Sequence, residues 1–317
     1  MPTTEHDHRC RVFGTEVRVL VRSPSPTAAA RLDALRVQAL LQRLHRTLTR
    51  FDPDSELSRL NARAGEEVAV SPTLLRAIDA ALWAARVSDG LADPTILDHL
   101  ERIGYASSRA GQTPAPLAEA LAAAPARRPA AARRPARWAS IALDGSRSTV
   151  RLPAGVRIDL GGSAKGLGAD LAAELLSRHA GYAVDAGGDI RIGGSAPVPR
   201  AVHIRHPLHD DIAHSLTITT GAVATSGLHT RIWRTAQGFA HHLIDPARGT
   251  PAWTGVIQAS ALAPTALEAE TLAKTALLRG PRAGRDLLDR HGGALILDDG
   301  RLLLAGGLAT TPNRAAA

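Results

Sequence analysis

Helical and strand-like segments alternate along this chain, but not with the regular strand–helix–strand spacing of a parallel sheet. An amphipathic pattern over Thr27–Phe51 predicts a long helix, and Ser71–Gly90 predicts a second helix with a serine cap and a glycine stop. Further along, short apolar runs broken by glycine and proline predict hairpins. We therefore expect an α+β fold, with mostly antiparallel sheets and flanking helices, rather than a doubly wound fold.

The two ends of the chain differ from its middle. Residues 1–9 are polar and predict a flexible N-terminal tail, and residues 313–317 predict a short tail at the other end. Alternating valines within Cys10–Arg22 predict the first strand. With 317 residues, 44% of them hydrophobic, the chain is long enough to bury a large core as one elaborate domain or two modest ones.

Residues 106–137 are rich in Ala, Pro and Arg and have few large apolar side chains. Such a composition is typical of a linker or a surface insertion, and we do not expect it to enter the core. It also holds much of the positive charge behind the formal net charge of +8. Because no base-reading helix, stacking-aromatic motif or zinc spacing accompanies this charge, we predict no nucleic-acid partner, although the charge favours anionic ligands in general.

The single cysteine and the lengths of the apolar runs indicate the cellular compartment. Cys10 is the single cysteine and cannot form an internal disulfide, and the residues around it match neither a secretory signal nor a lipidation site. No run approaches the roughly 20 apolar residues that a membrane-spanning helix needs. We expect a cytoplasmic protein without membrane insertion.

Lys165 stands out because the chain contains only two lysines, at 165 and 274, among 38 basic Lys and Arg residues. It lies in the glycine-rich stretch GGSAKGLG, between a strand that ends at Asp159 and a predicted helix. Backbone amides at a helix N-terminus bind phosphate well, and an ammonium is a compact cation. An ordinary turn with a solvated lysine is about equally consistent with this stretch alone.

Several other turns carry polar residues but are weak signals on their own. They are LADPT at 91–95, DAGGDI at 185–190 and HHLIDPARG at 241–249. Asp-Pro turns are common, and adjacent histidines on a strand point to opposite faces. No transition-metal site is therefore predicted.

Taken together and in order, these segments resemble the ApbE family, the FAD:protein FMN transferases. The resemblance runs from Val12 to Gly280 through the segments VFGTEVRV, DPDSELSRLN, LADPTILDHL, IDLGGSAKGLGADLAAELL, AVDAGGDIRIGG, AVATSG, HHLIDPARGTP and APTALEAETLAKTALLRG. It implies one bilobal domain over residues 10–312, with FAD in a central cleft. It also implies Mg²⁺-dependent transfer of the FMN half of FAD to a Thr or Ser hydroxyl of an acceptor protein, with release of AMP.

The resemblance assigns roles to residues of this chain. His242 is the implied proton acceptor for the attacking hydroxyl, with Lys165 at the phosphates, while Asp245 either orients the site or forms the turn. The implied FAD contacts are Phe13, Phe51, Leu91, Ala92, Asp93, Asp159, Lys165, Asp189 and Leu243. For the two phenylalanines core packing is an alternative role. For Asp189 the alternative is a structural role in its turn.

The implied magnesium site departs from the family. The family uses the carbonyl that corresponds to Gly162, an Asp on a late helix, and a Thr four residues after it. Here Glu270 replaces the Asp and Lys274 stands at the Thr position, while Thr275 lies about 100° further around the helix. We hypothesise that the Lys274 ammonium takes over part of the metal's charge, pairing with Glu270 or with the pyrophosphate, so that metal binding is weaker or catalysis is altered.

Three other functions remain open from the sequence. The same fold could hydrolyse FAD to free FMN and AMP, or it could bind FAD without reacting. The Arg-rich segment could instead bind an anionic polymer.

Overall fold

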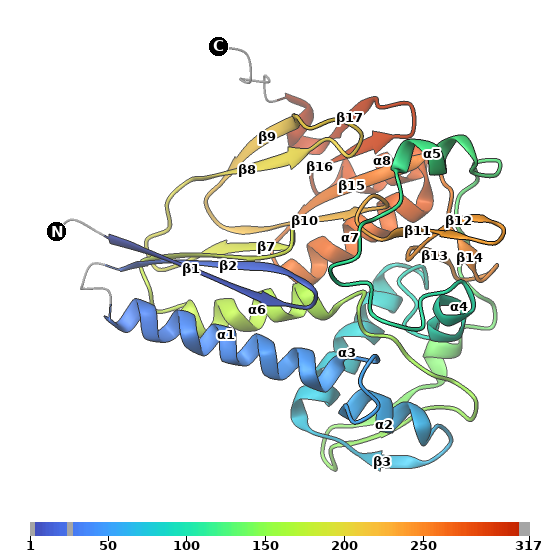
Figure 1. The fold of residues 1–317 in the computed structure, drawn as a ribbon. Coiled ribbons are helices and arrows are strands. Elements are labelled where there is room, and N and C mark those ends of the chain that lie inside the picture. The colour runs from blue at the N-terminus through green and yellow to red at the C-terminus, as the bar shows by residue number, and fades with distance from the viewer. Residues whose placement is uncertain (1–3, 24–27, 311–317) are drawn as a thin grey trace.

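An eight-stranded sheet lies at the centre of the computed structural model, which describes residues 4–23 and 28–310 (Figure 1). In spatial order its strands are β1 (Thr4–Val12), β2 (Thr15–Ser23), β6 (Gly181–Ala186), β7 (Ile190–Gly193), β10 (Gly221–Gly227), β15 (Val256–Ala263), β16 (Gly293–Leu297) and β17 (Leu302–Ala305). Neighbouring strands pair antiparallel throughout this described sheet. The predicted α+β class with antiparallel sheet is confirmed.

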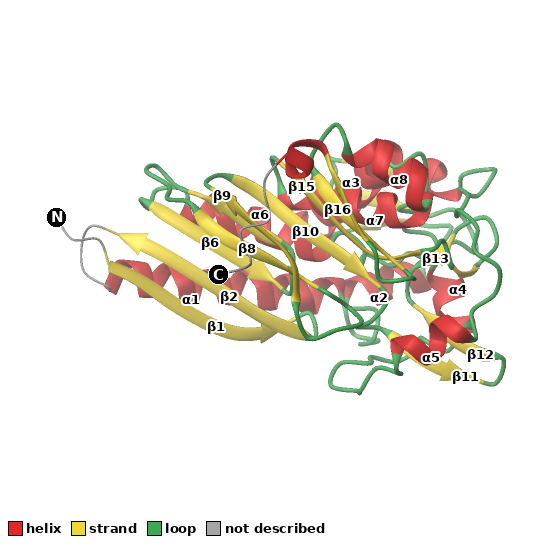
Figure 2. Ribbon diagram, turned by 90° about the horizontal axis from the view of Figure 1, so that it is seen from above, coloured by secondary structure: helices red, strands yellow, loops and turns green. Residues whose placement is uncertain are grey.

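Long helices line the sheet side by side (Figure 2). They are α1 (Ala28–Leu48), α6 (Ala164–Leu176), α7 (Ala266–Arg279) and α8 (Pro281–Leu288). In chain order they contact β1 and β2, then β6 and β7, then β10 and β15, and finally β16 and β17. The hairpin of β8 (Arg200–Arg205) and β9 (Ile212–Ile218) adds Val202, Ile204 and Leu216 to the same large core.

A second lobe has its own hydrophobic core (lower part of Figure 1). Its elements are α2 (Glu56–Ala62), α3 (Pro72–Val87) and a small sheet of β3 (Glu67–Ala69), β5 (Thr149–Arg151) and β4 (Ala142–Asp144), next to the 3₁₀ turn η1 (Arg137–Ser140). Ser55 and Ser71 cap α2 and α3 by accepting hydrogen bonds from Ser58 N and Leu74 N. The sequence predicted α3 and its serine cap.

The N-terminal expectations need correction. Residues 4–9 are not a tail, because they belong to β1, and Cys10–Arg22 is not one strand, because the chain reverses at Phe13 and Gly14. Both turn residues have positive φ, 56° and 72°. The strand pattern of residues 4–9 was missed because polar side chains such as those of His6 and His8 occupy the inward positions. The expected tail at 313–317 lies outside the described residues.

The Ala/Pro/Arg-rich segment is also more integrated than its composition predicts. It forms α5 (Leu117–Ala122), and Leu117 and Ala120 are buried in the large core. Ala115 N and Ala130 N donate hydrogen bonds to the carbonyls of Ile232 and Leu278. Expecting the whole of 106–137 outside the core was therefore wrong. Small apolar side chains and backbone hydrogen bonds hold this segment against the core, and the hydropathy of its sequence reveals neither kind of contact.

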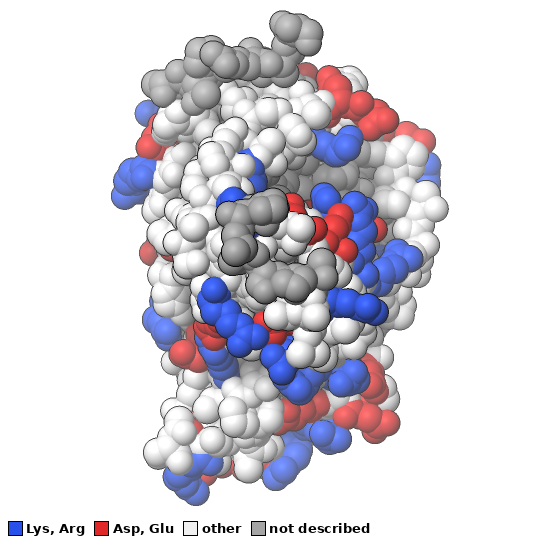
Figure 3. Space-filling model, turned by 90° about the vertical axis from the view of Figure 1, so that its left-hand side faces the viewer, with Lys and Arg blue, Asp and Glu red and all other residues white. Residues whose placement is uncertain are grey.

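The remaining elements gather next to this segment. They are α4 (Leu97–Arg102), the hairpin β11 (Ile232–Thr235) and β12 (Gly238–His241), and the short pair β13 (Ile244–Asp245) and β14 (Thr250–Pro251), with η2 (Gly306–Thr310) closing the described chain. No helix in the described residues is long and apolar enough to cross a membrane. On the face in Figure 3 basic and acidic side chains are interspersed, so the net charge does not form one continuous basic field there.

Gly166 sits where α6 and α7 approach most closely. A Cβ added there would lie 2.7 Å from the Ala266 carbonyl oxygen and 2.8 Å from Leu267 Cα, both of them backbone atoms. We expect Gly166→Ala to lower the free energy of unfolding by about 1–3 kcal/mol, because backbone cannot move aside as a side chain can. Urea denaturation measures this.

Gly145→Ala is the matched control, since a Cβ there meets no described atom within 4 Å. It should change the free energy of unfolding by less than about 0.5 kcal/mol. Equal effects of the two substitutions would contradict the packing argument.

His241 at the end of β12 is fully buried against Trp253, with ring centroids 4.7 Å apart. Leu243 N donates to its Nδ1, and burial lowers its pKa to about 3. Below about pH 6.5 the unfolded chain therefore binds a proton that the native ring refuses, so stability falls as the pH falls towards 3. Relative to His241→Asn, the wild type should lose up to about 1.4 kcal/mol per pH unit between pH 6 and 4.

Urea unfolding of both proteins at several pH values tests this difference. The other histidines are common to both proteins, so their contributions cancel. Parallel stability profiles would show that His241 does not titrate abnormally.

Candidate functional site

Four segments that are distant in sequence come together at one end of α6. They are the first turn of α6 with Lys165, the β6–β7 turn with Asp189, α7 with Glu270 and Lys274, and the segment after β12 with His242. The contact of α6 with α7 explains the first part of this convergence. Asp170 of α6 accepts hydrogen bonds from Ala266 N and Leu267 N at 2.8 and 3.0 Å and so caps α7.

Lys165 is held by carboxylates on two sides. Its Nζ forms an ion pair with Asp189 and lies 4.0 Å from Glu270 Oε1. Burial opposes the charge of Lys165, but Asp189 and Glu270 outweigh burial and raise its pKa. Lys165 is therefore a fixed cation at neutral pH, not the solvated turn lysine that the sequence left open.

Asp189 and Glu270 are buried carboxylates, 0% and 4% exposed. Glu270 Oε2 accepts a hydrogen bond from Gly166 N at 3.0 Å. Burial and the neighbouring Asp189 raise the pKa of Glu270 to about 7, although Lys165 and Lys274 act in the opposite direction. The structure thus brings together Lys165, Asp189 and Glu270.

Lys274 lies one helical turn after Glu270 and points at the glycine turn. Its Nζ donates a hydrogen bond to the Gly162 carbonyl oxygen. Burial lowers the pKa of Lys274, while Glu270, Asp189 and Asp159 favour its charged form. The hydrogen-bond partner of Lys274 is thus the Gly162 carbonyl, while Glu270, one of the two partners hypothesised from sequence, acts on it through charge.

The oxygens at the implied magnesium site, and that of the neighbouring Thr275, are engaged with protein groups. The Gly162 carbonyl accepts from Lys274, and Glu270 accepts from Gly166 N. The Thr275 hydroxyl donates to the Thr271 carbonyl at 2.6 Å. Mg²⁺ usually binds proteins through one or two carboxylates, together with waters and substrate phosphates. Here the one carboxylate is held by Gly166 N and Lys165, and an ammonium takes the carbonyl, so these residues do not fit the ion.

Asp159 is paired with an arginine that sequence reasoning missed. Arg50 Nε donates to Asp159 Oδ2 at 2.6 Å, and Arg50 Nη2 donates to the Tyr105 carbonyl at 2.6 Å. The guanidinium lies 4.2 Å from the Phe51 ring centroid and 4.7 Å from that of Tyr105. Its buried Nη1 has no hydrogen-bond partner in the described part of the chain. The only sequence signal was its position next to Phe51.

Phe51 begins a row of aromatic side chains. Its ring is 36% exposed and lies 5.6 Å from that of Tyr105, which in turn lies 5.4 Å from Trp233. An exposed aromatic ring backed by other rings and a guanidinium can stack on a planar ligand. Tyr105 and Trp233 were not among the expected residues.

The loop at 91–95 lies beside Asp159. The Pro94 carbonyl accepts a hydrogen bond from Asp159 N at 2.8 Å, and Asp93 Oδ1 accepts from Thr95 N at 2.7 Å. Ala92 N donates to Ser88 Oγ. The Leu91 side chain, in contrast, is buried in the large core.

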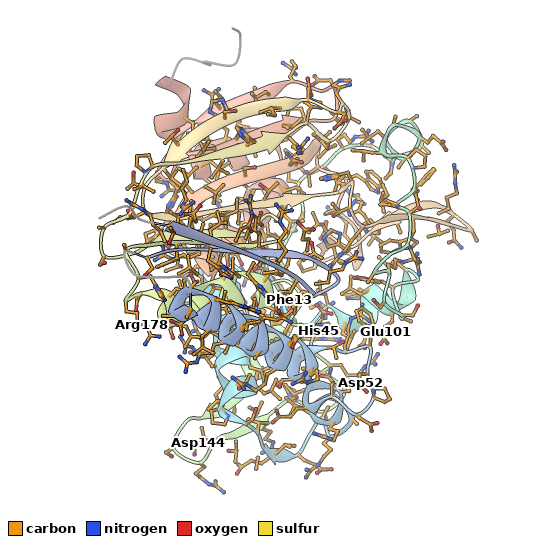
Figure 4. All side chains as sticks on the ribbon, turned by 60° about the vertical axis from the view of Figure 1, so that its left-hand side comes forward. Phe13, His45, Asp52, Glu101, Asp144 and Arg178 are labelled. Carbon is orange, nitrogen blue, oxygen red and sulfur yellow. The ribbon has the colours of Figure 1, made fainter. Side chains whose placement is uncertain are left out.

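Two other expected FAD contacts point into packed regions. Phe13 makes an edge-to-face contact with His45 of α1, with centroids 5.6 Å apart, and Figure 4 shows both near the tip of the β1–β2 hairpin. The Leu243 side chain is 3% exposed in the large core. For both side chains the structure shows core packing.

His242 carries an imidazole that is neutral at pH 7. Burial lowers its pKa well below the ordinary value, and Arg231, His241 and Lys274 lower it further. The backbone of Arg231 forms a hydrogen bond with the ring. Its Nδ1 has no hydrogen-bond partner within residues 4–23 and 28–310. A neutral ring with a free nitrogen can accept a proton.

Asp245 is used by the turn that follows. Its Oδ1 accepts hydrogen bonds from Ala131 N, Ala247 N and Arg248 N at 3.1–3.3 Å, and Oδ2 pairs with Arg248. Of the two roles considered from sequence, these contacts favour the turn over direct participation. Ala131 belongs to the Ala/Pro/Arg-rich segment, so that segment helps to fix the turn after His242.

A cavity of about 770 Å³ lies elsewhere, between Tyr182, Arg191, Gly221, Arg290 and His291. None of the expected site residues lines it. The FAD cleft between the lobes therefore stays a prediction.

Comparison with known proteins gives consistent results. The model of the ApbE family matches residues 13–297. The chain is 31% identical to an FAD:protein FMN transferase of Treponema pallidum, over 94% of this chain and 86% of that protein, and 25% identical to one of Haemophilus influenzae, over 86% and 80%.

Solved structures agree in fold. The crystal structure of the ApbE protein of Thermotoga maritima superposes with a TM-score of 0.79 at 26% identity, covering 95% of this chain and 97% of that one. The flavin transferase ApbE of Vibrio cholerae superposes with a TM-score of 0.73 at 21% identity, over 97% and 99%, which shows the shared fold. From its matched segments, its site and these relatives, the chain belongs to the ApbE family.

Proposed function

We propose that this protein is an FAD:protein FMN transferase, which moves the FMN moiety of FAD to a Thr or Ser hydroxyl of an acceptor protein and releases AMP. Relatives that align over most of the chain carry this name. The observation that carries the proposal is the neutral His242 imidazole near Arg231 and Lys274, with Lys165 held as a cation by Asp189 and Glu270 in the same cluster. This pairs a proton acceptor with groups that attract phosphate.

The reaction requires one substitution at phosphorus. The acceptor hydroxyl oxygen forms a bond to the FMN-side phosphorus of the pyrophosphate, and the bond from that phosphorus to the bridging oxygen breaks. AMP leaves with the electron pair, and the hydroxyl proton passes to His242. Because little covalent chemistry falls to the protein in such transfers, positioning and charge stabilisation dominate.

The cations of the site provide the charge stabilisation that this transfer needs. Lys165 is fixed by Asp189 and Glu270, so it needs little reorganisation when negative charge develops on the phosphates. The Arg231 side chain adds positive potential, since its charge acts on both Lys165 and His242. No step is assigned to Mg²⁺, because the residues at its implied site do not fit it.

FAD would be held along the line from Phe51 to Lys165. The exposed Phe51 ring offers a stacking surface for a flavin or adenine ring. The Asp159–Pro94 hydrogen bond joins Asp159 to the 91–93 loop. These residues would contact FAD between the stacked ring and the phosphates. The unpartnered Arg50 Nη1 is an additional donor for a polar edge of the ligand. Phe13 and Leu243 would contribute through packing behind this surface.

FAD hydrolysis and FAD binding without reaction remain as second candidates, because both would use the same residues. Incubating the protein with FAD, with and without an acceptor flavoprotein domain that is FMN-modified on threonine, separates the three. Mass spectrometry of the acceptor detects covalent FMN, and chromatography detects free FMN and AMP. Covalent FMN on the acceptor is expected; free FMN alone would indicate a pyrophosphatase, and intact FAD a binding protein.

His242→Gln tests the proton acceptor. We expect the rate of FMN attachment at saturating FAD to fall by about 10²–10⁴-fold, which is typical for loss of a general base. FAD affinity, followed by flavin fluorescence, should change little. A variant that attaches FMN at the wild-type rate would exclude His242 from proton transfer.

The flavin-facing surface is tested by Phe51→Ala. Loss of one stacked ring should weaken FAD binding about 3–10-fold, corresponding to about 0.5–1.5 kcal/mol. Val87→Ala is the control, because Val87 is also an exposed apolar side chain but lies at the end of α3 outside the site. If both variants bind FAD as the wild type does, Phe51 does not contact the ligand.

A further inference from the structure

The position of Lys274 has a chemical consequence for the transfer reaction. Its ammonium is hydrogen-bonded to the Gly162 carbonyl, the oxygen that the family resemblance assigns to the metal. A Cβ built on Gly162 would lie only 2.7 Å from Nζ. The ammonium therefore occupies the space next to this turn.

A magnesium ion would compete with the ammonium for the same oxygen. Mg²⁺ sits about 2.0–2.1 Å from its ligand oxygens and keeps a nearly octahedral shell. An ion on the same lone pair of the Gly162 oxygen would overlap with Nζ, and on either lone pair the two like charges would repel each other. Lys274 would have to leave the turn before a metal could bind there.

The neighbouring oxygens offer few further ligands to a metal ion that displaces Lys274. Glu270 is tied to Gly166 N and lies near Lys165, and the Thr271 hydroxyl donates to the Leu267 carbonyl at 2.8 Å. Thr275 likewise donates to its own helix. Each of these oxygens already serves another contact, so a metal would gain few ligands here.

The ammonium can meet the electrostatic demand that the metal would meet. Lys274 carries three N–H donors, of which the Gly162 carbonyl takes one. Two donors remain for phosphate oxygens. Lys165 provides a further cation, 4.0 Å from Glu270 Oε1.

We propose that Lys274 is a tethered substitute for the divalent cation, so that this protein binds the pyrophosphate of metal-free FAD and transfers FMN without Mg²⁺. The inference rests on the proposed transferase function for its catalytic part, whereas the binding part stands on the site alone. In the reaction Lys274 donates hydrogen bonds to the phosphate oxygens and neutralises the charge that develops on the leaving AMP.

The experiment compares wild type, Lys274→Met, and the double variant Glu270→Asp with Lys274→Thr. FAD affinity is measured by flavin fluorescence in EDTA and in Mg²⁺, and metal binding is measured with Mn²⁺ by electron paramagnetic resonance. FMN attachment to the acceptor is followed under the same two conditions. Circular dichroism confirms that each variant is folded.

For the wild type we expect FAD affinity and attachment rate to agree within about twofold in EDTA and in Mg²⁺, with no stoichiometric Mn²⁺ signal. Lys274→Met should lose attachment by about 100-fold or more in EDTA and bind FAD more weakly, because its chain length is kept but the charge is removed. The double variant should bind Mn²⁺ and depend on Mg²⁺.

Two results would overturn the inference. One is stoichiometric Mn²⁺ binding by the wild type, or loss of its FAD affinity or attachment in EDTA. The other is a Lys274→Met variant with wild-type FAD affinity in EDTA. If no protein attaches FMN under either condition, the transferase proposal fails, while the Mn²⁺ and FAD-affinity measurements still decide whether Lys274 replaces the metal.

Discussion

The close packing of α6 against α7 is the contact on which the site depends. Gly166 lets the two backbones touch, Asp170 caps the first turn of α7, and Glu270 reaches back to Gly166 N. These contacts lie along one face of α6, so they fix the position of α7 along α6 as well as its distance. Lys165, one residue before Gly166, is thereby placed against Glu270. A side chain larger than hydrogen at 166 would push α7 away from α6, and so would separate Lys165 from Glu270 and Lys274.

The charges of the cluster explain why this arginine-rich chain keeps lysine at two positions. Each ammonium makes close contacts as a compact cation: Lys165 lies between Asp189 and Glu270, and Lys274 contacts the Gly162 carbonyl. A planar guanidinium is wider and requires a flat partner. Arginine appears instead where a broad contact exists, as at Arg50, which pairs with Asp159 while it lies over two aromatic rings. The site thus distributes its cations according to the shape of each pocket.

Much of the fold and most of the site could be predicted, but for different reasons. The helices at 72–87 and 266–279 follow from local capping and apolar spacing, which the sequence displays directly. The convergence of Lys165, Asp189, Glu270 and His242 came from the order of matched segments, not from any local pattern. Residues 4–9 and 106–137 were misjudged because polar side chains and small alanines contribute through hydrogen bonds and close packing. Arg50 was missed because its partners, Asp159 and Tyr105, lie 109 and 55 residues away.

The sequence by itself determined the α+β class, the helix caps, the family and the presence of a lysine where a metal-binding threonine was implied. These properties depend on residue type and on spacing over a few turns of chain. Only the tertiary structure decided what Lys274 touches, that His242 is kept neutral, and that Asp245 serves its turn. Hydrogen-bond partners and local burial are set by segments distant in the chain, and no short stretch of sequence contains that information.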